Sequence, residues 1–408
     1  MKKIAVMGYG TVGQGVVEVV LKNKDLISER IGEEIQIKYV LDLREFPGDP
    51  AEHMIVHDFD TILNDEEIEV VVETIGGTNA AYQFVKSCLL AGKSVATSNK
   101  ALVAEYGAEL LQLAKDKNVN FLFEASVGGG IPIIRPLNTS LTGDHIDEIS
   151  GILNGTTNYM MTKMFYEGAD YNEVLKKAQD KGFAELNPEA DVEGHDACRK
   201  IAILSSVITN KTVDFNDIYC EGITGITTED MKYAKEMEMT IKLLAISKND
   251  ETGLEAMVAP FLIDENHPLY NVNGVFNSVF VHGNALGDGM FYGSGAGKLP
   301  TASAVVGDVV DALRNKGKTI MPVWDVNKLA LKKHEDTKRK FFLRIKGDGK
   351  AKEADVLAMF PGGKIQSLSG ANDEFGVITD VMSEGMCAEK IAALGTDFIH
   401  MIRVEESL

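Results

Sequence analysis

The most informative stretch of the sequence, residues 178–200, brings several acidic residues close to one lysine. They are Glu185, Asp191, Glu193, Asp196 and Lys200. Asp196 and Lys200 are four residues apart in HDACRKIAILSSV, which has the pattern of a helix, so they share one face. A hydride transfer between an alcohol and an aldehyde needs a group that removes or returns the hydroxyl proton, and a lysine oriented by a carboxylate can do this. The alternative from spacing alone is an exposed ion pair on a helix.

A second lysine follows a predicted strand. The run KSVATSNKALVA places Ser98 and Lys100 directly after the strand-like KSVAT. Ligands of open parallel sheets bind outside the carboxyl ends of the strands. Lys100 is therefore a second candidate ammonium beside a bound nicotinamide, and the alternative is an ordinary charge at the start of a helix.

A glycine-rich loop lies at the N-terminus. Gly8, Gly10 and Gly13 form G-x-G-x-x-G between the strand-like KKIAVM and the helix-like GTVGQGVVEVVLKN. The first glycine permits a tight turn, the second lets the backbone approach a pyrophosphate, and the third allows close helix packing. The N-terminus of the following helix attracts phosphate. In this context the motif predicts a dinucleotide site rather than a plain glycine turn.

The residues that would distinguish NAD from NADP lie after the second predicted strand. Asp42 follows Gly13 by 29 residues, and the insertion KDLISERIGEE explains why this exceeds the usual spacing of about 20. Asp42 would favour the free 2′-hydroxyl of NAD, whereas Arg44 could pair with the 2′-phosphate of NADP. Two solvated loop charges are the alternative, so the sequence leaves both coenzymes open.

Residues 1–130 alternate short apolar runs with helix-like segments. Strand-like runs such as KKIAVM and EVVVET are almost continuously apolar, which is typical of parallel strands covered on both faces. The βαβ alternation predicts an α/β fold with a Rossmann-type, doubly wound nucleotide-binding domain. A late helix over residues 301–317 is expected to pack back on this domain and complete it.

The rest of the chain predicts two further regions. Residues 131–300 read as an α+β substrate-binding and oligomerisation domain, with strands at GLEAMVAPFLI and FNSVFVHGNAL and one long helix over ITTEDMKYAKEMEMTIKLLAISKN. Residues 318–340 are rich in charge and read as a linker. Residues 341–408 follow the order strand, helix, strand, strand, helix, strand, which predicts a small βαββαβ sandwich.

Composition excludes several classes of function. The chain has 408 residues, 45% of them hydrophobic, and a formal net charge of −20. Such an acidic surface repels phosphate backbones and anionic lipids, so we expect no nucleic-acid or membrane partner. No apolar run reaches the ~18 residues needed to cross a bilayer. The four cysteines lack CxxC spacing, which predicts a reduced cytoplasmic protein without a disulfide framework or zinc site.

The acidic stretch also resembles a known family, through residues that fit a long signature. The matching residues are Ala178, Gly182, Phe183, Ala184, Asn187, Pro188, Asp191, Val192, Gly194, Asp196 and Lys200. This pattern is similar to that of homoserine dehydrogenases. The segments GYGTVG, ETIGG, SNKAL, EASVGGGIPII, LNGTTNYM and GSGAGKLPTASAVVGDV extend the resemblance over about residues 1–320. The tail resembles an ACT domain, an amino-acid-sensing module often fused to these enzymes.

The resemblance implies reversible, NAD(P)-dependent interconversion of L-homoserine and L-aspartate 4-semialdehyde in threonine and methionine biosynthesis. Lys200 would be the catalytic proton donor and acceptor, and Lys100 would lie near both the nicotinamide and the substrate. Glu185, Asp191 and Asp196 would hold the substrate's amino group or orient the lysines. A zwitterionic substrate needs carboxylates for its ammonium and a cation for its carboxylate.

Motif and resemblance together predict the cofactor contacts and a cation site. The cofactor contacts are Gly8, Gly10, Thr11, Val12, Gly13, Asp42, Arg44, Thr74, Ser98, Lys100 and Gly295. The family also binds a structural Na⁺ or K⁺ through main-chain oxygens, which the resemblance assigns to Glu124, Val127, Gly129 and Ile131. Glycines let carbonyl groups converge on such a hard cation. A flexible hinge between domains is the alternative for this run.

Regulation, assembly and two other functions complete the expectations. The resemblance implies L-threonine as an effector, although the tail's first loop, KGDGKAKEAD, lacks the Pro-Gly common in ACT domains. It also implies a homodimer or homotetramer. Another Rossmann oxidoreductase of amino acids or sugars is an alternative that the 178–200 signature argues against. A catalytically silent amino-acid sensor is a second, and the retained Lys100 and Lys200 argue against it.

Overall fold

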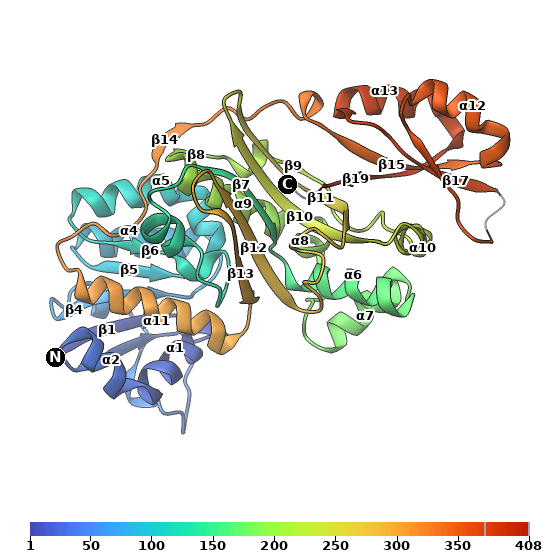
Figure 1. The fold of residues 1–408 in the computed structure, drawn as a ribbon. Coiled ribbons are helices and arrows are strands. Elements are labelled where there is room, and N and C mark those ends of the chain that lie inside the picture. Colours follow the sequence, from blue (N-terminus) through green and yellow to red (C-terminus); the bar gives the residue numbers. More distant parts are fainter. Residues whose placement is uncertain (371–372, 407–408) are drawn as a thin grey trace.

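The computed structural model describes residues 1–370 and 373–406. Figure 1 shows three regions in chain order: an N-terminal α/β domain in blue and cyan, a central sheet in green and yellow, and a C-terminal unit in red. The N-terminus lies at one end of the molecule, whereas the C-terminus lies beside the central sheet. The chain therefore returns to its middle after building the C-terminal unit.

The N-terminal domain contains a six-stranded parallel sheet of order β3-β2-β1-β4-β5-β6. Its strands are β1 (Lys2–Met7), β2 (Ile35–Leu41), β3 (Ile55–Val56), β4 (Ile68–Glu73), β5 (Ser94–Thr97) and β6 (Phe121–Leu122). Its helices are α1 (Thr11–Lys22), α2 (Lys24–Ile31), α3 (Phe59–Leu63), α4 (Asn79–Leu90) and α5 (Lys100–Asp116). The apolar strands are buried on both faces, as their composition predicts. Helix α2 is the insertion that lengthens the interval between Gly13 and Asp42.

A late helix returns to this domain. Helix α11 (Lys298–Arg314) lies against α1 in Figure 1, although the two helices are far apart in the sequence. The two helices approach so closely that a Cβ at Gly15 would lie 2.6 Å from the Lys298 carbonyl oxygen. Glycine at this position therefore lets α11 pack closely on α1 of the N-terminal domain.

The central region is a long, mostly antiparallel sheet with helices beside it. Its strands are β7 (Ile146–Ile152), β9 (Tyr219–Cys220), β10 (Met239–Asp250), β11 (Gly253–Asp264), β12 (Phe276–Gly283) and β13 (Gly287–Ser294). Its helices are α6 (Gly155–Glu167), α7 (Tyr171–Asp180), α8 (Glu189–Val192), α9 (His195–Thr209) and α10 (Thr228–Glu236).

The prediction of one long helix over ITTEDMKYAKEMEMTIKLLAISKN is wrong. The helix α10 ends at Glu236, and Glu238 takes a left-handed conformation with φ of 56°. The apolar half of the segment then forms β10, which pairs along its whole length with β11. A two-stranded pairing that buries every residue from 240 to 247 outweighs the local preference for helix.

The segment expected as a linker is docked on the N-terminal domain. Trp324 is buried beside α5, where a Cβ at Gly107 would lie 2.6 Å from the indole. After it, β14 (Asp325–Lys328) pairs in parallel with the short β8 (Lys211–Thr212). The path between the central and C-terminal regions is therefore held by packing and by backbone hydrogen bonds.

The C-terminal unit extends the central sheet. Its elements are β15 (Lys338–Lys346), α12 (Gly349–Met359), β16 (Lys364–Gln366), β17 (Glu374–Ile378), β18 (Met382–Ser383), α13 (Glu384–Leu394) and β19 (Phe398–Val404). Strand β19 pairs with β15 on one side and with β11 on the other, so that one sheet of eleven strands crosses the boundary.

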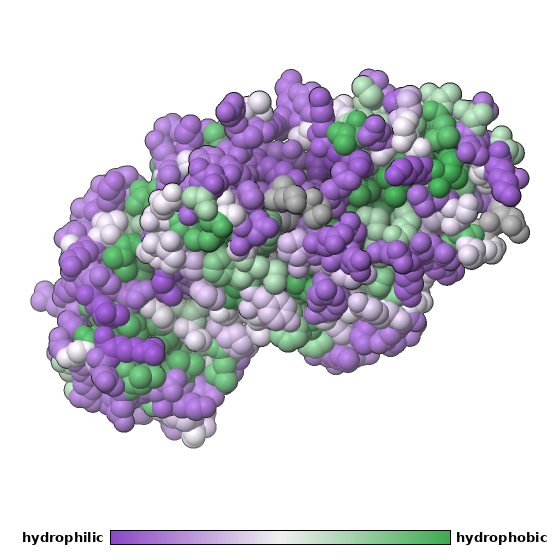
Figure 2. Space-filling model, in the orientation of Figure 1, coloured by the Kyte–Doolittle hydropathy of each residue, from purple (hydrophilic) through white to green (hydrophobic). Residues whose placement is uncertain are grey.

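The surface is mostly polar. Hydrophilic residues dominate the face drawn in Figure 2, in line with the net charge of −20. Among the described residues, no helix is both long and apolar enough to span a bilayer.

Candidate active site

The glycine loop has the geometry of a phosphate-binding turn. Gly8 has φ of 92°, and a Cβ there would lie 2.7 Å from the Thr74 carbonyl oxygen. A Cβ at Gly13 would lie 1.9 Å from the Gly8 oxygen, whereas nothing lies within 4 Å of a Cβ at Gly10. The Thr74 hydroxyl donates to the Gly8 carbonyl at 2.9 Å and so supports the turn from behind. The loop is tightly packed on one side and open at Gly10.

The start of α1 is electrically suited to an anion. Gly10 caps the helix without a side-chain hydrogen bond, and the first turn carries no acidic residue. Within the described chain, no acceptor is paired with the backbone N–H groups of Thr11, Val12 and Gly13. Free N–H groups at a helix N-terminus attract phosphate, so these residues fit the pyrophosphate of a dinucleotide.

Asp42 and Arg44 form a bidentate pair after β2. The Arg44 Nε and Nη2 atoms each donate to Asp42 at 2.9 Å, and the Tyr9 backbone N–H donates to the same carboxylate. The guanidinium hydrogen bonds hold the pKa of Asp42 well below its ordinary value despite the opposing effect of burial. The Arg44 side chain remains 64% exposed and lies over the Phe46 ring. The arginine is thus fixed at one edge and open to solvent at the other.

A buried carboxylate at the end of β4 was not found from the sequence. Glu73 is fully buried and accepts hydrogen bonds from the Thr97 hydroxyl at 2.6 Å and the Ile75 N–H at 2.8 Å. Burial raises its pKa. Thr97 in turn accepts from the Asn99 N–H, and Asn99 caps α5. Glu73 thereby fixes the loop that carries Ser98, which is half-buried, and Lys100.

The centre of the site is one carboxylate between two lysines. Asp196 Oδ1 lies 2.7 Å from Lys100 Nζ, and Asp196 Oδ2 lies 2.8 Å from Lys200 Nζ. Lys100 comes from the N-terminal domain and Lys200 from α9 of the central region, so the site lies where these regions meet. Asp196 and Lys200 are only 5% and 7% exposed. This excludes the alternative of a surface ion pair.

Two cations determine the charge state of Asp196. Burial alone would raise its pKa, but the charges of Lys200 and Lys100, together with their hydrogen bonds, hold the pKa well below its ordinary value. The two lysines therefore favour the ionised form of Asp196. A buried carboxylate with two ammonium partners leaves a net positive charge at this point of the site.

Asn154 links the two acids and was missed from the sequence. Its Nδ2 atom donates to Asp191 at 2.8 Å and to Asp196 at 3.0 Å, while its Oδ1 atom caps α6 through the Thr157 N–H. An Asn followed by Gly-Thr-Thr before a helix is an N-cap signal that could have drawn attention to it. Burial raises the pKa of Asp191 even though Asn154 donates to it.

Two further predicted contacts, Glu185 and Gly295, lie in different surroundings. Glu185 lies in segment 181–187, which is exposed except at Ala184, and its side chain has no hydrogen bond or ion pair with the rest of the described chain. Gly295 is close to the glycine run of residues 128–130, because a Cβ at Gly129 would lie 2.3 Å from the Gly295 oxygen. The Gly130 N–H also donates to Ser294 at 3.0 Å. The two loops at the domain boundary therefore support each other.

The segment predicted to bind a cation, residues 124–131, offers main-chain oxygens as ligands. The Glu124 carboxylate accepts three backbone N–H groups, those of residues 133, 134 and 135, and is not free to bind an ion. The main-chain oxygens of Val127, Gly129 and Ile131 accept no hydrogen bond within the described residues. These oxygens fit the type of ligand that an alkali cation prefers. Across residues 1–370 and 373–406 no His/Cys/Asp/Glu cluster suited to a metal ion occurs.

Comparison with known proteins gives the family. A family profile described as "Homoserine dehydrogenase, NAD binding domain" matches residues 8–124, and one described as "Homoserine dehydrogenase" matches residues 132–310. Homoserine dehydrogenase of Bacillus subtilis is 43% identical over 316 residues, which cover 77% of this chain and 73% of that protein. This chain belongs to the homoserine dehydrogenase family.

Solved homoserine dehydrogenases extend the likeness to the whole fold. The crystal structure of the Thiobacillus denitrificans homoserine dehydrogenase superimposes with a TM-score of 0.90 at 34% identity, covering 99% of this chain and 98% of that one. A hyperthermophilic archaeal homoserine dehydrogenase in complex with NADPH matches 76% of this chain and 97% of its own, with a TM-score of 0.65 and 27% identity. The expected α/β fold and the NAD(P)-dependent oxidoreductase activity of a homoserine dehydrogenase are confirmed.

The contrast between two loop glycines gives a test of the coenzyme site in this homoserine dehydrogenase. Gly10→Val should fold normally, because the Cβ points into open space and the backbone is extended. It should nevertheless weaken NADPH binding by about 100-fold or more, since the side chain occupies the space of the pyrophosphate. NADPH fluorescence titration and the melting temperature measure both effects.

Gly13→Val is the matched control. Its Cβ meets the Gly8 oxygen at 1.9 Å, so this variant should lose several degrees of melting temperature even without coenzyme. NADPH binding by Gly10→Val with wild-type affinity would contradict the phosphate-loop assignment.

Proposed function

We propose that Lys200 is the proton donor and acceptor in the reversible, NAD(P)-dependent interconversion of L-homoserine and L-aspartate 4-semialdehyde. The observation that carries this proposal is the sharing of Asp196 by Lys100 and Lys200 across the domain boundary. An amine that is buried, oriented and close to the coenzyme domain is what the chemistry requires.

The hydrogen bonds of Lys200 support this role. Its ammonium has three donors, of which one meets the Leu153 carbonyl oxygen at 2.6 Å and one meets Asp196 at 2.8 Å. The third remains for the substrate oxygen. Two fixed partners determine the direction of the third N–H bond, so the proton is aimed without further ordering of the side chain.

The proton and hydride movements balance in both directions. A bound nicotinamide coenzyme supplies or accepts the hydride at C4 of the substrate. In reduction, the Lys200 ammonium gives a proton to the aldehyde oxygen and recovers one from solvent. In oxidation, neutral Lys200 takes the hydroxyl proton of homoserine. Asp196 stays ionised and steadies the ammonium in each case.

The zwitterionic substrate matches the remaining charges. Within the described residues, Asp191 accepts one hydrogen bond, from Asn154, and has no lysine within ion-pair distance. A half-buried carboxylate without a cation favours a ligand ammonium. Lys100 has two donors beyond its bond to Asp196 and suits the substrate carboxylate. Glu185, on its exposed segment, remains a predicted substrate contact.

We infer that Arg44 selects for NADP. Its exposed guanidinium edge suits a 2′-phosphate, while Asp42 already accepts from Tyr9 and Arg44 and has little capacity for a ribose hydroxyl. The NADPH complex of the archaeal relative agrees with this preference. Thr11, Val12 and Gly13 would hold the pyrophosphate, and Ser98, Lys100 and Gly295 would lie near the nicotinamide.

The cation, the effector and the assembly are also proposals. Na⁺ or K⁺ would bind the main-chain oxygens of Glu124, Val127, Gly129 and Ile131. The order of β19, β15, β17 and β16 with α12 and α13 on the sheet supports an ACT-type sensor for threonine. Exposed Met290 and Tyr292 on the edge strand β13 support a homodimer or homotetramer. A cytoplasmic location remains a prediction.

Lys200→Met tests the proton-transfer role. The substitution keeps the aliphatic stem and removes the amine, so kcat should fall by about 10²–10⁴ while NADPH binding is retained. Steady-state rates with homoserine, read from NADPH absorbance, give kcat. Lys176→Met is the control, because Lys176 forms an exposed ion pair with Asp180. An unchanged kcat in Lys200→Met would remove Lys200 from the mechanism.

Asp191→Asn tests the substrate ammonium site. The amide can still accept from Asn154, but the lost charge should raise the KM for homoserine by about 10–100-fold. Because burial raises the pKa of Asp191, the wild-type KM should begin to rise on acidification at a higher pH than for an ordinary aspartate. Asp191→Asn should show the high KM for homoserine at every pH and should lack the rise in KM on acidification, which we call the acidic limb.

Asp180→Asn, an exposed position, is the control for the loss of one carboxylate. An acidic limb of the same shape in Asp191→Asn as in wild type would show that another group binds the ammonium.

Arg44→Ala tests the coenzyme proposal. Loss of the guanidinium should raise the KM for NADP by about tenfold or more and leave the KM for NAD within about twofold, because only NADP carries the 2′-phosphate. Initial rates with both coenzymes measure the ratio. Equal changes for NAD and NADP would assign Arg44 to loop structure instead.

A further inference from the structure

The two substrate-side acids flank one tight turn. Asp191 lies in α8 on one side and Asp196 lies in the first turn of α9 on the other, with residues 192–195 between them. We call residues 192–194 the carboxylate turn. Any shift of this turn moves both acids, and it also moves Lys200 because α9 starts directly after it.

A separate stretch of chain, residues 220–223, supports the carboxylate turn. We call residues 220–223 the support segment. A Cβ at Gly222 would lie 2.1 Å from the Val192 carbonyl oxygen, and the Ile223 N–H donates to that same oxygen at 2.8 Å. Gly194 has φ of 82°, and its Cβ would lie 3.1 Å from the Cys220 sulfur. At Gly222 backbone therefore packs directly on backbone, where no side chain can absorb a displacement.

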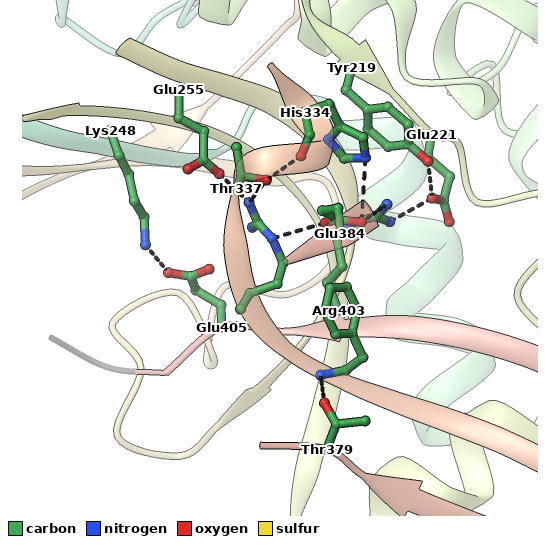
Figure 3. A network of polar contacts seen from close by, with 12 residues as sticks. Tyr219, Glu221, Lys248, Glu255, His334, Thr337, Thr379, Glu384, Arg403 and Glu405 are labelled. Carbon is green, nitrogen blue, oxygen red and sulfur yellow. Dashed lines mark hydrogen bonds and ion pairs between the residues drawn. The ribbon is translucent and has the colours of Figure 1, made fainter. Parts of the chain in front are cut away.

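The support segment is held in turn by the C-terminal unit. Glu221 Oε2 accepts from Arg403 Nη1 at 2.6 Å and from the Tyr219 hydroxyl at 2.9 Å (Figure 3). Arg403 lies on β19, is 1% exposed, and uses its Nε and Nη2 atoms on Glu384 of α13 at 2.7 Å and 3.1 Å. The Tyr219 ring stacks on the His334 ring, and the Arg403 guanidinium lies 4.8 Å from the Tyr219 ring centroid.

Opposite charges favour this contact. Arg403 keeps its charge at every physiological pH, and a buried guanidinium needs carboxylates on its donors. Glu384 takes one side of the guanidinium and Glu221 takes the other. The backbone path is short as well, because β19 pairs with β11 at Arg403 and β11 pairs with β9 at Tyr219 and Cys220.

A second ionic contact fixes the chain beyond the support segment. Asp230, in the first turn of α10, is fully buried and accepts from Arg344 of β15 at 3.0 Å and from His400 of β19 at 3.1 Å. The stretch from Tyr219 to Asp230 is thus bound to the C-terminal unit at both ends. Residues 220–223, next to the Tyr219 end, pack against the carboxylate turn.

We propose that Glu221 and Arg403 are positioning residues for the reaction: by holding the support segment, they set the carboxylate turn at the distance from Lys100 that homoserine binding requires. They touch neither substrate nor coenzyme and act through Asp191 and Asp196. The proposal rests on the assignment of these two acids to the substrate site. It makes the C-terminal unit part of the enzyme's substrate affinity.

Glu221→Gln is the test. The Glu221 side chain is 31% exposed and Arg403 keeps both bonds to Glu384, so the variant should fold with nearly the wild-type melting temperature. The KM for homoserine should rise by about fivefold to twentyfold, with the KM for NADPH measured in the reverse reaction changing less than about twofold. A KM for homoserine equal to that of wild type would overturn the proposal.

Glu255→Gln is the matched control. Glu255 pairs with Arg339 in the same junction and comes from β11, outside the support segment. It loses the same charge, yet the KM for homoserine should stay within about twofold of wild type. An equal rise in both variants would show a general loss of junction stability and would contradict the specific role of Glu221.

Three further measurements complete the design: Arg403→Lys, its combination with Glu221→Gln, and Asp191→Asn. In the double variant Glu221→Gln/Arg403→Lys, the KM for homoserine should equal the larger single effect, because both residues act through one contact; additive effects would contradict this. Asp191→Asn is measured beside them. If Asp191→Asn changes KM and Glu221→Gln does not, only the positioning proposal fails, whereas an unchanged KM in Asp191→Asn overturns the substrate-site assignment itself.

Discussion

One buried carboxylate shared by two lysines is the constraint on which the site depends. Asp196 can remain ionised inside the protein only because Lys100 and Lys200 lie on its two oxygens. The lysines come from different domains, so their meeting requires α5 and α9 to be held in register. Three contacts hold α5 and α9 in place: the docked segment around Trp324, the packing of α11, and the contact between Gly129 and Gly295.

Features encoded by local sequence were predictable. The glycine loop is a contiguous motif whose conformation follows from backbone sterics, and the parallel strands follow from continuous apolar runs. Lys200 and Asp196 were predicted as a pair because helical spacing places them on one face. Their burial, and the arrival of Lys100 at the same carboxylate, depend on contacts between segments about 100 residues apart.

What the sequence did not reveal depends on tertiary partners. The segment after α10 has helix-like composition, yet pairing with β11 makes it a strand. Asn154 was missed because its two acceptors lie 37 and 42 residues further along the chain. Arg403 gives no local signal at all, since its partners Glu384 and Glu221 come from different regions. Polar groups that are satisfied across long sequence distances are the least readable part of a chain.

The two ionic centres share a design and differ in the cation. Asp196 forms ion pairs with two lysines, and Glu384 forms ion pairs with two arginines, Arg339 and Arg403. Lysine can release a proton when its surroundings change, whereas arginine does not, and its planar donors fix geometry in two directions. Lysines therefore lie at the proposed proton-transfer site, and arginines lie at the junction of the central sheet and the C-terminal unit. The choice of cation thus separates the proposed catalytic centre, between α5 and α9, from the support at the junction with the C-terminal unit.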